Sequence, residues 1–303
     1  MLAGALLLDL LAGEYPSRWH PVVWMGVLTD RLIDFAPKDS QGEQFVYGVL
    51  VVGVVVGVFT FGTWFIVDII RQYNPGFAVV AGALLLKPTF SIRGLWRAAR
   101  GVQGALAAGE IEEARVAVSH LVSRDVAVLG QRQIASAAVE SVAENFTDSV
   151  VAPLLWFVAF GPAGAMGYRA ANTLDAMIGY HGRFEFLGKF AARLDDVLNL
   201  IPARIAALVL LLATPLSGAN LRMAWLTLWR DHAHTASPNA GWTMSALAGA
   251  LGVRLEKSGH YTLGSGFAIA AGSDIGRSLR LYWNATSILV ALCFVLLAVL
   301  HAG

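Results

Sequence analysis

Residues 46–70, VYGVLVVGVVVGVFTFGTWFIVDII, are the clearest membrane-spanning stretch of the chain and contain one charged residue, Asp68. A helix needs roughly 20 apolar residues to cross the ~30 Å hydrocarbon core of a bilayer. This stretch is long enough, so we predict a membrane span here. A turn at residues 71–76 is followed by a shorter apolar run over 77–86, which predicts a return span closed by Pro88.

The composition of the whole chain agrees with a membrane protein. Of the 303 residues, 56% are hydrophobic and only 14% are charged, whereas ordinary soluble domains carry roughly 25% charged residues. The net charge of +1 argues against a nucleic-acid partner. The single cysteine, Cys293, excludes a disulfide framework or a cysteine-based zinc site. Residues 2–12 are apolar but short and contain Asp9, so we expect no cleavable signal peptide there.

Other segments predict further membrane-embedded helices. Residues 150–171 are apolar but interrupted at Gly161-Pro162, which predicts two half-helices that enter and leave on the same side. Residues 200–216 and 281–300 predict two more apolar helices. Basic residues gather in 87–132 and 183–204, which places these stretches in the cytoplasm.

The predicted fold class follows from these segments. We expect an all-α, polytopic integral membrane protein with about 4–6 membrane-embedded helices, some of them short or re-entrant. Cytoplasmic helical segments should carry the active site. We expect residues 1–303 to form a single membrane-embedded catalytic domain.

An acidic segment, ASAAVESVAENFTD over residues 135–148, has the spacing of a polar helix face. Read as a helix, it places Glu140, Glu144 and Asp148 at i, i+4 and i+8 on one side. Like charges at this spacing repel one another. Ionisable groups beside a membrane segment are usually functional. We therefore expect arginines, a divalent metal or a cationic ligand opposite these carboxylates, with Arg124 and Arg193 as the expected arginines.

Two more clusters combine carboxylates and amides at helical spacing. Asn172 and Asp175 form one, and Asp195, Asp196 and Asn199 form the other. Oxygen ligands of this kind suit Mg²⁺, which commonly binds one or two carboxylates together with substrate phosphates. Arg193 and Arg204 flank the second cluster and are candidates to neutralise phosphate. A Walker-type phosphate loop is absent from the sequence, so a nucleotide would be held by another arrangement.

Six motifs of the chain occur together in a known family. They are HPVVWMG (20–26), LVSRD (121–125), AAVESVAENFTDSVVAPL (137–154), YRAANTLDAMIGY (168–180), AARLDDVLNLIPAR (191–204) and SPNAGWTMSALAGALGVRL (237–255). From about residue 4 to residue 280 the chain resembles the cobalamin biosynthesis protein family CobD/CbiB, the membrane-bound adenosylcobinamide-phosphate synthases. Three positions depart from the pattern expected of the family: Ser123, Ser149 and Thr243. They leave its charged and amide groups intact.

The resemblance implies an ATP- and Mg²⁺-dependent, ADP-forming carbon–nitrogen ligase. Such an enzyme joins (R)-1-aminopropan-2-ol, either free or, more usually in the family, as its O-phosphate, to the free propionate of adenosylcobyric acid. The product is adenosylcobinamide or adenosylcobinamide phosphate, and the sequence leaves both open. The implied location is the cytoplasmic membrane, multi-pass, with the active site facing the cytoplasm. The implied partners are these substrates, the lipid bilayer and other membrane enzymes of nucleotide-loop assembly.

The resemblance also assigns roles to the polar clusters. Asp195, Asp196 and Asn199 become ligands of Mg-ATP, and Arg124 and Arg193 become phosphate clamps. Glu140 and Glu144 are candidates for a second metal or for the general base. The remaining residues are expected to extend the polar site or contact cofactor and substrate: Asp148, Asn172, Asp175, Arg204, His20 and Asn239.

Two other classes of protein share some of these features. An intramembrane Mg²⁺-dependent prenyltransferase would also use aspartate-rich clusters, but it would turn over without ATP. A secondary transporter would contain broken helices with polar residues. It would usually show an internal repeat as well, and this sequence shows none.

Overall fold

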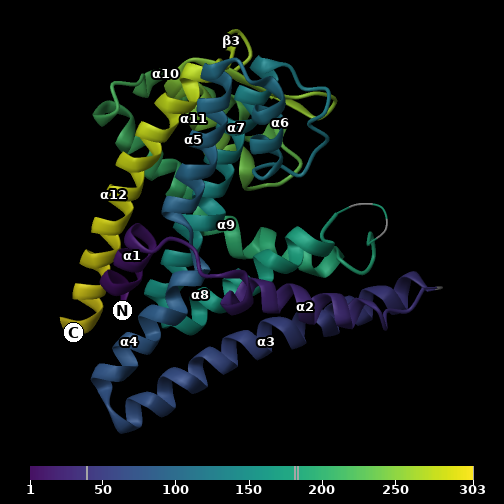
Figure 1. Cartoon of the computed structure of the whole chain (residues 1–303), viewed down its shortest axis with the longest axis vertical. Coiled ribbons are helices and arrows are strands. Elements are labelled where there is room, and N and C mark those ends of the chain that lie inside the picture. The colour runs from purple at the N-terminus through teal and green to yellow at the C-terminus, as the bar shows by residue number, and fades with distance from the viewer. Residues whose placement is uncertain (39, 181, 183, 303) are drawn as a thin grey trace. The chain divides into compact units, whose positions relative to one another are not determined.

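The computed structural model describes residues 1–38, 40–180, 182 and 184–302 and is helical over most of its length (Figure 1). Arg183, which the sequence places in a cytoplasmic stretch, lies outside the described residues. The chain forms two compact units. Unit 1 contains Met1–Ser91 and Ala152–Asn199, and unit 2 contains Ile92–Val151 and Leu200–Gly303. The single catalytic domain stays a prediction.

Within the described chain, five helical stretches are long and apolar enough to cross a membrane. They are Gln41–Tyr73, Pro75–Ala108, Gln131–Ile178, Lys189–Leu216 and Gly272–Leu300. The all-α, polytopic membrane class predicted from the sequence is therefore confirmed.

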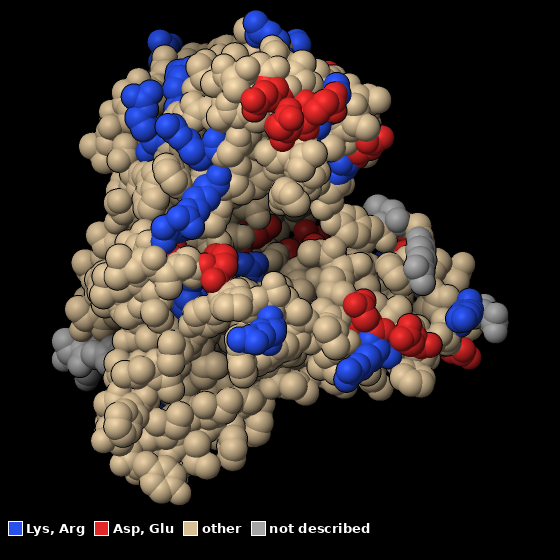
Figure 2. All heavy atoms as spheres, in the orientation of Figure 1, with Lys and Arg blue, Asp and Glu red and all other residues tan. Residues whose placement is uncertain are grey.

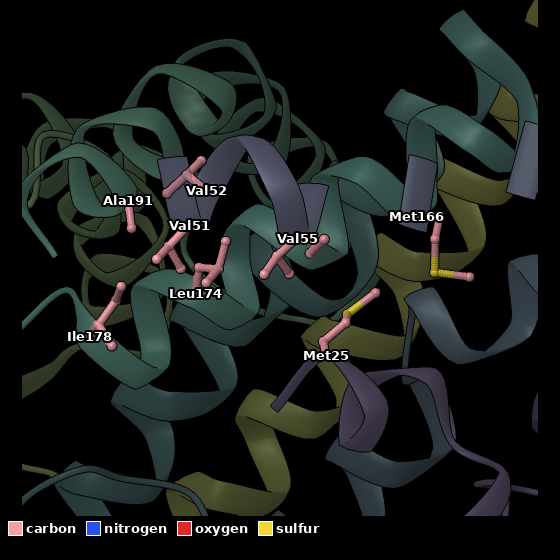
Figure 3. Close-up of a cluster of buried hydrophobic side chains, with 9 residues drawn as sticks. Met25, Val51, Val52, Val55, Met166, Leu174, Ile178 and Ala191 are labelled. Atoms are coloured by element: carbon pink, nitrogen blue, oxygen red, sulfur yellow. The ribbon is translucent and has the colours of Figure 1, made fainter. Parts of the chain in front are cut away.

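Unit 1 is built around the two long helices α3 and α8. Its elements are α1 (Leu2–Leu11), η1 (Ser17–Trp19), α2 (Pro21–Ile33), α3 (Gln41–Tyr73), α4 (Pro75–Leu86), η2 (Lys87–Thr89), α8 (Ala152–Ile178) and the first part of α9 (Lys189–Leu216). Helix α8 packs against α2, α3 and α4. Met25, Val55 and Leu174 belong to the buried core between these helices (Figure 3).

Helix α3, which contains the span predicted at residues 46–70, has apolar side chains on both its buried face and its exposed face. Val51 and Val55 are buried against α8, whereas Val58, Phe61 and Phe65 are more than half exposed. An exposed apolar row on a long helix is what a lipid-facing surface requires. Figure 2 shows broad uncharged areas between the groups of charged side chains. The turn to α4 is made by Asn74, whose side chain caps the first backbone N–H groups of that helix.

Gly48 of α3 allows another part of unit 1 to approach closely. A Cβ atom at this position would lie 2.0 Å from the carbonyl oxygen of Leu187. No real Cβ contact is that short, so the position requires glycine. This contact fixes the segment that leads from α8 into α9 against α3.

Unit 2 has α7 at its centre. Its elements are α5 (Ile92–Ala108), α6 (Ile111–Ser119), α7 (Gln131–Phe146), the π-helical turn η3 (Thr147–Val151), the second part of α9, α10 (Leu221–Asp231), η4 (His232–His234), α11 (Ala240–Leu251), β1 (Val253–Lys257), β2 (Tyr261–Leu263), β3 (Ala268–Ile269) and α12 (Gly272–Ala302). Helix α7 contacts α5, α6, α11, α12 and β1.

A small sheet in unit 2 was not predicted. Strand β1 lies in its middle, antiparallel to β2 and parallel to β3. The β1–β2 turn contains Gly259 with a φ of +76°, a conformation that favours glycine. The strands are 5, 3 and 2 residues long, which is too short for a period-2 pattern to stand out in the sequence.

The structure refines four of the predicted boundaries. The acidic helix ends at Phe146 and continues through the π-helical turn into α8. The predicted break at Gly161 is a kink inside α8, where Phe160 and Gly161 leave helical geometry. Helix α9 begins at Lys189, so the polar cluster and the apolar run 200–216 form one helix. Helix α12 begins at Gly272, nine positions before the predicted span.

Candidate active site

The aspartate cluster predicted on α9 forms a hydrogen-bonded network with α8 in unit 1. Asp195 accepts hydrogen bonds from the side-chain amides of Asn172 at 3.2 Å and Asn199 at 3.0 Å. Asn199 is buried, and its side-chain oxygen Oδ1 accepts a hydrogen bond from the Tyr168 hydroxyl at 3.0 Å. Because each amide is itself held in place, the Asp195 carboxylate has a fixed orientation.

Asp196 lies beside this network in a different environment. The Arg193 guanidinium is 3.4 Å from its Oδ2 atom, and the Arg193 side chain is 74% exposed. The spacing on the helix placed Arg193 one turn from Asp196, and the structure agrees; the role of Arg193 as a phosphate clamp stays a prediction. An exposed arginine next to a partly buried carboxylate is free to turn toward an incoming anion.

Of the three predicted Mg²⁺ ligands, the carboxylates Asp195 and Asp196 are suited to hold the ion, whereas Asn199 uses its side chain for other contacts. Asp195 and Asp196 supply the one or two carboxylates that Mg²⁺ commonly takes beside substrate phosphates, and each Asp195 oxygen retains a lone pair after its one amide hydrogen bond. Asn199 uses its oxygen for Tyr168 and its amide for Asp195, so in this arrangement it orients Asp195. Among the described residues there is no group of three or more His, Cys, Asp or Glu side chains arranged for a metal ion.

The network continues to a second charged cluster that the sequence did not indicate. Arg169 of α8 donates to Asn172 Oδ1 and to the carbonyl oxygen of Thr89 in η2, both at 3.0 Å. Two residues before Thr89, the fully buried Lys87 places its ammonium 3.1 Å from Asp9 and 3.0 Å from Glu14. The η2 turn therefore contacts both clusters within unit 1.

Glu14 gathers several donors around one carboxylate. It accepts hydrogen bonds from Ser91 at 2.5 Å and Lys87 at 3.0 Å, and His20 Nε2 lies 3.5 Å away. Partial burial by itself would raise the pKa of Glu14, but the contacts with His20, Ser91 and Lys87 outweigh it and lower the pKa to about 2. His20 also caps α2 through Nδ1. The predicted site residue His20 thus belongs to the Lys87 cluster.

In unit 2 one carboxylate of the acidic helix lies within ion-pair distance of an arginine, as predicted. Glu140 is buried, and its Oε2 lies 3.4 Å from Arg124 and accepts a hydrogen bond from Tyr261 at 2.9 Å. Its Oε1 accepts from Ser136 at 2.7 Å. Burial and the charge of Glu140 raise the pKa of the Tyr261 phenol, so it remains a donor at neutral pH.

The three carboxylates of the acidic segment differ in exposure. Glu140 is buried, Asp148 is half-buried in the π-helical turn, and Glu144 is exposed. The π-helical turn alters the regular spacing on which the predicted common face depended. Glu144 therefore has the access to solvent that a general base needs, whereas Glu140 is committed to its partners. The shared basin with Asp195 and Asp196 stays a prediction.

Arg204 and Asn239, both predicted to bind cofactor or substrate, contact each other. Arg204 donates to Asn239 Oδ1 at 2.6 Å and to the Leu200 carbonyl at 3.0 Å. Its guanidinium also lies over the Trp242 ring, 4.7 Å from the ring centre. These contacts attach the loop before α11 to α9, and they give Arg204 a role in structure whatever else it binds. The Asp175 side chain lies against Gly179, where a Cβ atom would be 2.0 Å from Asp175 Oδ1.

The fold and these clusters define a class of protein. It is an all-α, multi-pass membrane protein with buried ion pairs and carboxylate–amide networks, features that in membranes are usually functional. The family model described as CobD/Cbib protein matches residues 2–282. The chain therefore belongs to the CobD/CbiB family, in agreement with the resemblance of its motifs.

Curated relatives match over nearly the whole chain. The chain is 43% identical to the cobalamin biosynthesis protein CobD of Dehalococcoides mccartyi, over 94% of this chain and 93% of the relative. It is 41% identical to the probable cobalamin biosynthesis protein CobD of Thermococcus kodakarensis, over 97% of this chain and 94% of the relative. It is 38% identical to the CobD of Geobacter metallireducens, over 98% and 96%. No solved structure matches the chain.

Proposed function

We propose that the protein is an enzyme of cobalamin biosynthesis that makes an amide bond. Its substrates are the free propionate of adenosylcobyric acid and (R)-1-aminopropan-2-ol, as its O-phosphate, and the reaction consumes ATP with Mg²⁺. The observation that carries this proposal is the family match over residues 2–282, together with relatives named for cobalamin biosynthesis along the whole chain. The polar clusters of both units support it because they supply the residue types that the reaction needs.

The reaction must first activate a carboxylate, which is a poor electrophile. The propionate oxygen attacks the γ-phosphorus of ATP, ADP leaves, and an acyl phosphate forms. The amine then attacks the acyl carbon, the carbon–oxygen bond to phosphate breaks, and the amine loses a proton to a base. Phosphoryl transfer relies on positioning and on neutralisation of charge by cations.

The residues of this chain divide these tasks. Asp195 and Asp196 would hold Mg²⁺, which neutralises the phosphate charge when bound. Arg193, mostly exposed, would contact the transferred phosphate. Asn172, Asn199 and Tyr168 hold Asp195 in position. Exposed Glu144 would accept the proton from the amine. We place this chemistry on the cytoplasmic side of the cytoplasmic membrane, where ATP is available, near other membrane enzymes of nucleotide-loop assembly.

The test uses the purified full-length protein in detergent or nanodiscs. It is incubated with adenosylcobyric acid, ATP, Mg²⁺ and aminopropanol phosphate, and mass spectrometry identifies the corrinoid and nucleotide products. We expect adenosylcobinamide phosphate and ADP, with no product when ATP or Mg²⁺ is omitted. Release of AMP instead would show activation as an adenylate, and turnover without ATP would refute the ligase assignment.

The variant Asp196→Ala tests the metal assignment. Loss of one interaction that stabilises charge in the transition state commonly lowers the rate by roughly 10²–10³. We expect a loss of that order while the protein elutes and melts as the wild type does. Asp30→Ala, at a surface position of α2, serves as the matched control. Near-normal activity of well-folded Asp196→Ala would remove Asp196 from the metal site.

A further inference from the structure

A cavity of about 240 Å³ in unit 2 lies beside the Glu140 cluster. It is formed by the loop between α6 and α7, the start of α7, the end of β1 and the β1–β2 turn. Its lining residues are Arg124, Asp125, Val128, Leu129, Gln133, Glu256, Lys257, Ser258 and His260. Three of these side chains, Lys257, Ser258 and His260, were not expected to be functional. They meet Arg124 only because the small sheet folds beside α7.

The basic side chains of this cavity suit an anion. Arg124, Lys257 and His260 provide donors from two separate segments of the chain. The Arg124 side chain is only 15% exposed, and its Nε atom is buried without a hydrogen-bond partner among the described residues. A buried donor that lacks a partner is unfavourable. Because Arg124 lines the cavity, an anionic oxygen bound there would lie beside its guanidinium group.

The acidic side chains of the cavity add a second requirement. Asp125 accepts a hydrogen bond from the Ala127 backbone N–H through Oδ1, and Glu256 Oε2 lies 3.4 Å from Arg254. Both carboxylates nevertheless line the cavity. A ligand that carries an ammonium group as well as an anion matches this mixture of charges better than a purely anionic one.

The size of the cavity limits the ligand. Pockets for drug-sized ligands usually have volumes of about 300–1,000 Å³, and this cavity is smaller. A whole nucleotide triphosphate would not be enclosed here. A three-carbon amino alcohol esterified with phosphate is of suitable size, and it carries the two charges that the lining predicts.

We propose that this cavity binds the phosphorylated amino alcohol, with Lys257, His260 and Arg124 around its phosphate and with Glu256 or Asp125 near its ammonium. This assignment rests on the proposed function for the identity of the substrate. It makes Lys257 and His260 residues that select the phosphorylated amine over the free amine. The carboxylate–amide network of α8 and α9 is then the proposed binding site for ATP and Mg²⁺.

The first measurement is binding of aminopropanol phosphate to the full-length protein by calorimetry, without ATP or corrinoid. We expect the wild type to bind it, and inorganic phosphate to compete. Charge-assisted hydrogen bonds contribute roughly 1.5–3 kcal/mol, so Lys257→Gln should weaken binding on the order of ten- to a hundred-fold. Lys257→Arg should restore much of the affinity. His260→Gln, at an exposed turn position, provides a second variant if Lys257→Gln does not fold.

The second measurement is steady-state kinetics of the same variants. Lys257→Gln should raise the KM for aminopropanol phosphate and lower its preference over free aminopropanol, with the KM for ATP unchanged. Arg222→Gln, an exposed charge on α10 outside the cavity, is the matched control. A rise in the KM for ATP alone would assign the cavity to the nucleotide and overturn the proposal.

The two measurements separate this proposal from the proposed function. Binding by the wild type that is lost in Lys257→Gln, without any ligation, would support the cavity and refute the ligase assignment. Ligation with an unchanged KM for the amine in Lys257→Gln would refute the cavity and leave the ligase assignment standing. No binding and no ligation by the wild type would refute both.

Discussion

Lys87→Met tests whether the buried ion cluster of unit 1 holds that unit together. The Lys87 ammonium is fully buried and lies 3.1 Å from Asp9 and 3.0 Å from Glu14. Asp9 is also fully buried, and the Glu14 side chain is 39% exposed. Removing the lysine therefore leaves Asp9 in the interior without this cation, while Glu14 retains access to water.

The expected loss follows from the burial of Asp9. Removal of one partner from a buried ion pair typically costs about 3–5 kcal/mol, because an uncompensated charge remains. At ~2–4 °C per kcal/mol, this corresponds to a melting temperature lower by on the order of 6–20 °C. Lys87→Met/Asp9→Leu removes both buried charges together. It should melt within a few degrees of the wild type, because replacing a whole buried pair by apolar residues is often nearly neutral.

The assay is thermal unfolding of the purified protein in one detergent, followed by tryptophan fluorescence and by loss of the monodisperse peak on size exclusion. The substitutions leave all nine tryptophans in place. Asp9→Leu alone completes the double-mutant cycle and should be less damaging than Lys87→Met, since Glu14 still pairs with the lysine. Lys87→Met melting like the wild type, or a double variant no more stable than Lys87→Met, would refute the reasoning.

Three further predictions concern pH, packing and catalysis. Because the pKa of Glu14 is lowered from 4.5 to about 2, its contribution to stability is present above pH 4.5 and is lost as the pH falls toward 2. With a discount for partial exposure, we expect this contribution to be about 1–2 kcal/mol of unfolding free energy. The melting temperature of the wild type should therefore fall more steeply with acid than that of Glu14→Gln, and equal slopes would contradict the prediction. Gly48→Ala should destabilise the protein by at least ~2 kcal/mol because its Cβ would overlap the Leu187 carbonyl. Gly53→Ala on the same helix, where a Cβ would have nothing within 4 Å, should be neutral or slightly stabilising. Similar melting temperatures of the two variants would be evidence against the close approach at Gly48. Tyr168→Phe removes the hydroxyl that holds Asn199 and should lower the kcat of the ligase reaction roughly ten-fold with a small change in stability. The kcat is measured at several Mg²⁺ concentrations. Full activity at every concentration would show that Asp195 does not depend on the hydrogen bond between Tyr168 and Asn199.

Much of the fold could be predicted because its signals are local. Hydropathy over 46–70 defined α3, and Gly161-Pro162 located the kink of α8, since each depends on residues that are neighbours in the sequence. The two small strand pairings of unit 2 and the π-helical turn at Thr147–Val151 have no comparable local signal. They depend on packing around α7.

The contacts of the candidate site that are local in the sequence could also be predicted, and the long-range ones could not. The Asp195–Asn199 cluster and the pairing of Arg193 with Asp196 lie within one or two helical turns, so their spacing was informative. Helical spacing also indicated that the acidic helix needs positive partners, and Arg124 and Arg193 were the arginines expected. Arg124 lies beside Glu140, whereas the ion pair of Arg193 is with Asp196.

The contacts that sequence reasoning missed join residues that lie far apart along the chain. Glu14 and Lys87 are 73 positions apart, and Glu140 and Tyr261 are 121 positions apart. A lysine beside a proline after an apolar run gives no sign that its ammonium is fully buried. By itself the sequence determined the membrane class, the helices and the family, because these follow from local hydropathy and contiguous motifs. Only the tertiary structure decided which charges neutralise one another, because burial brings distant side chains together and makes each charge require a partner.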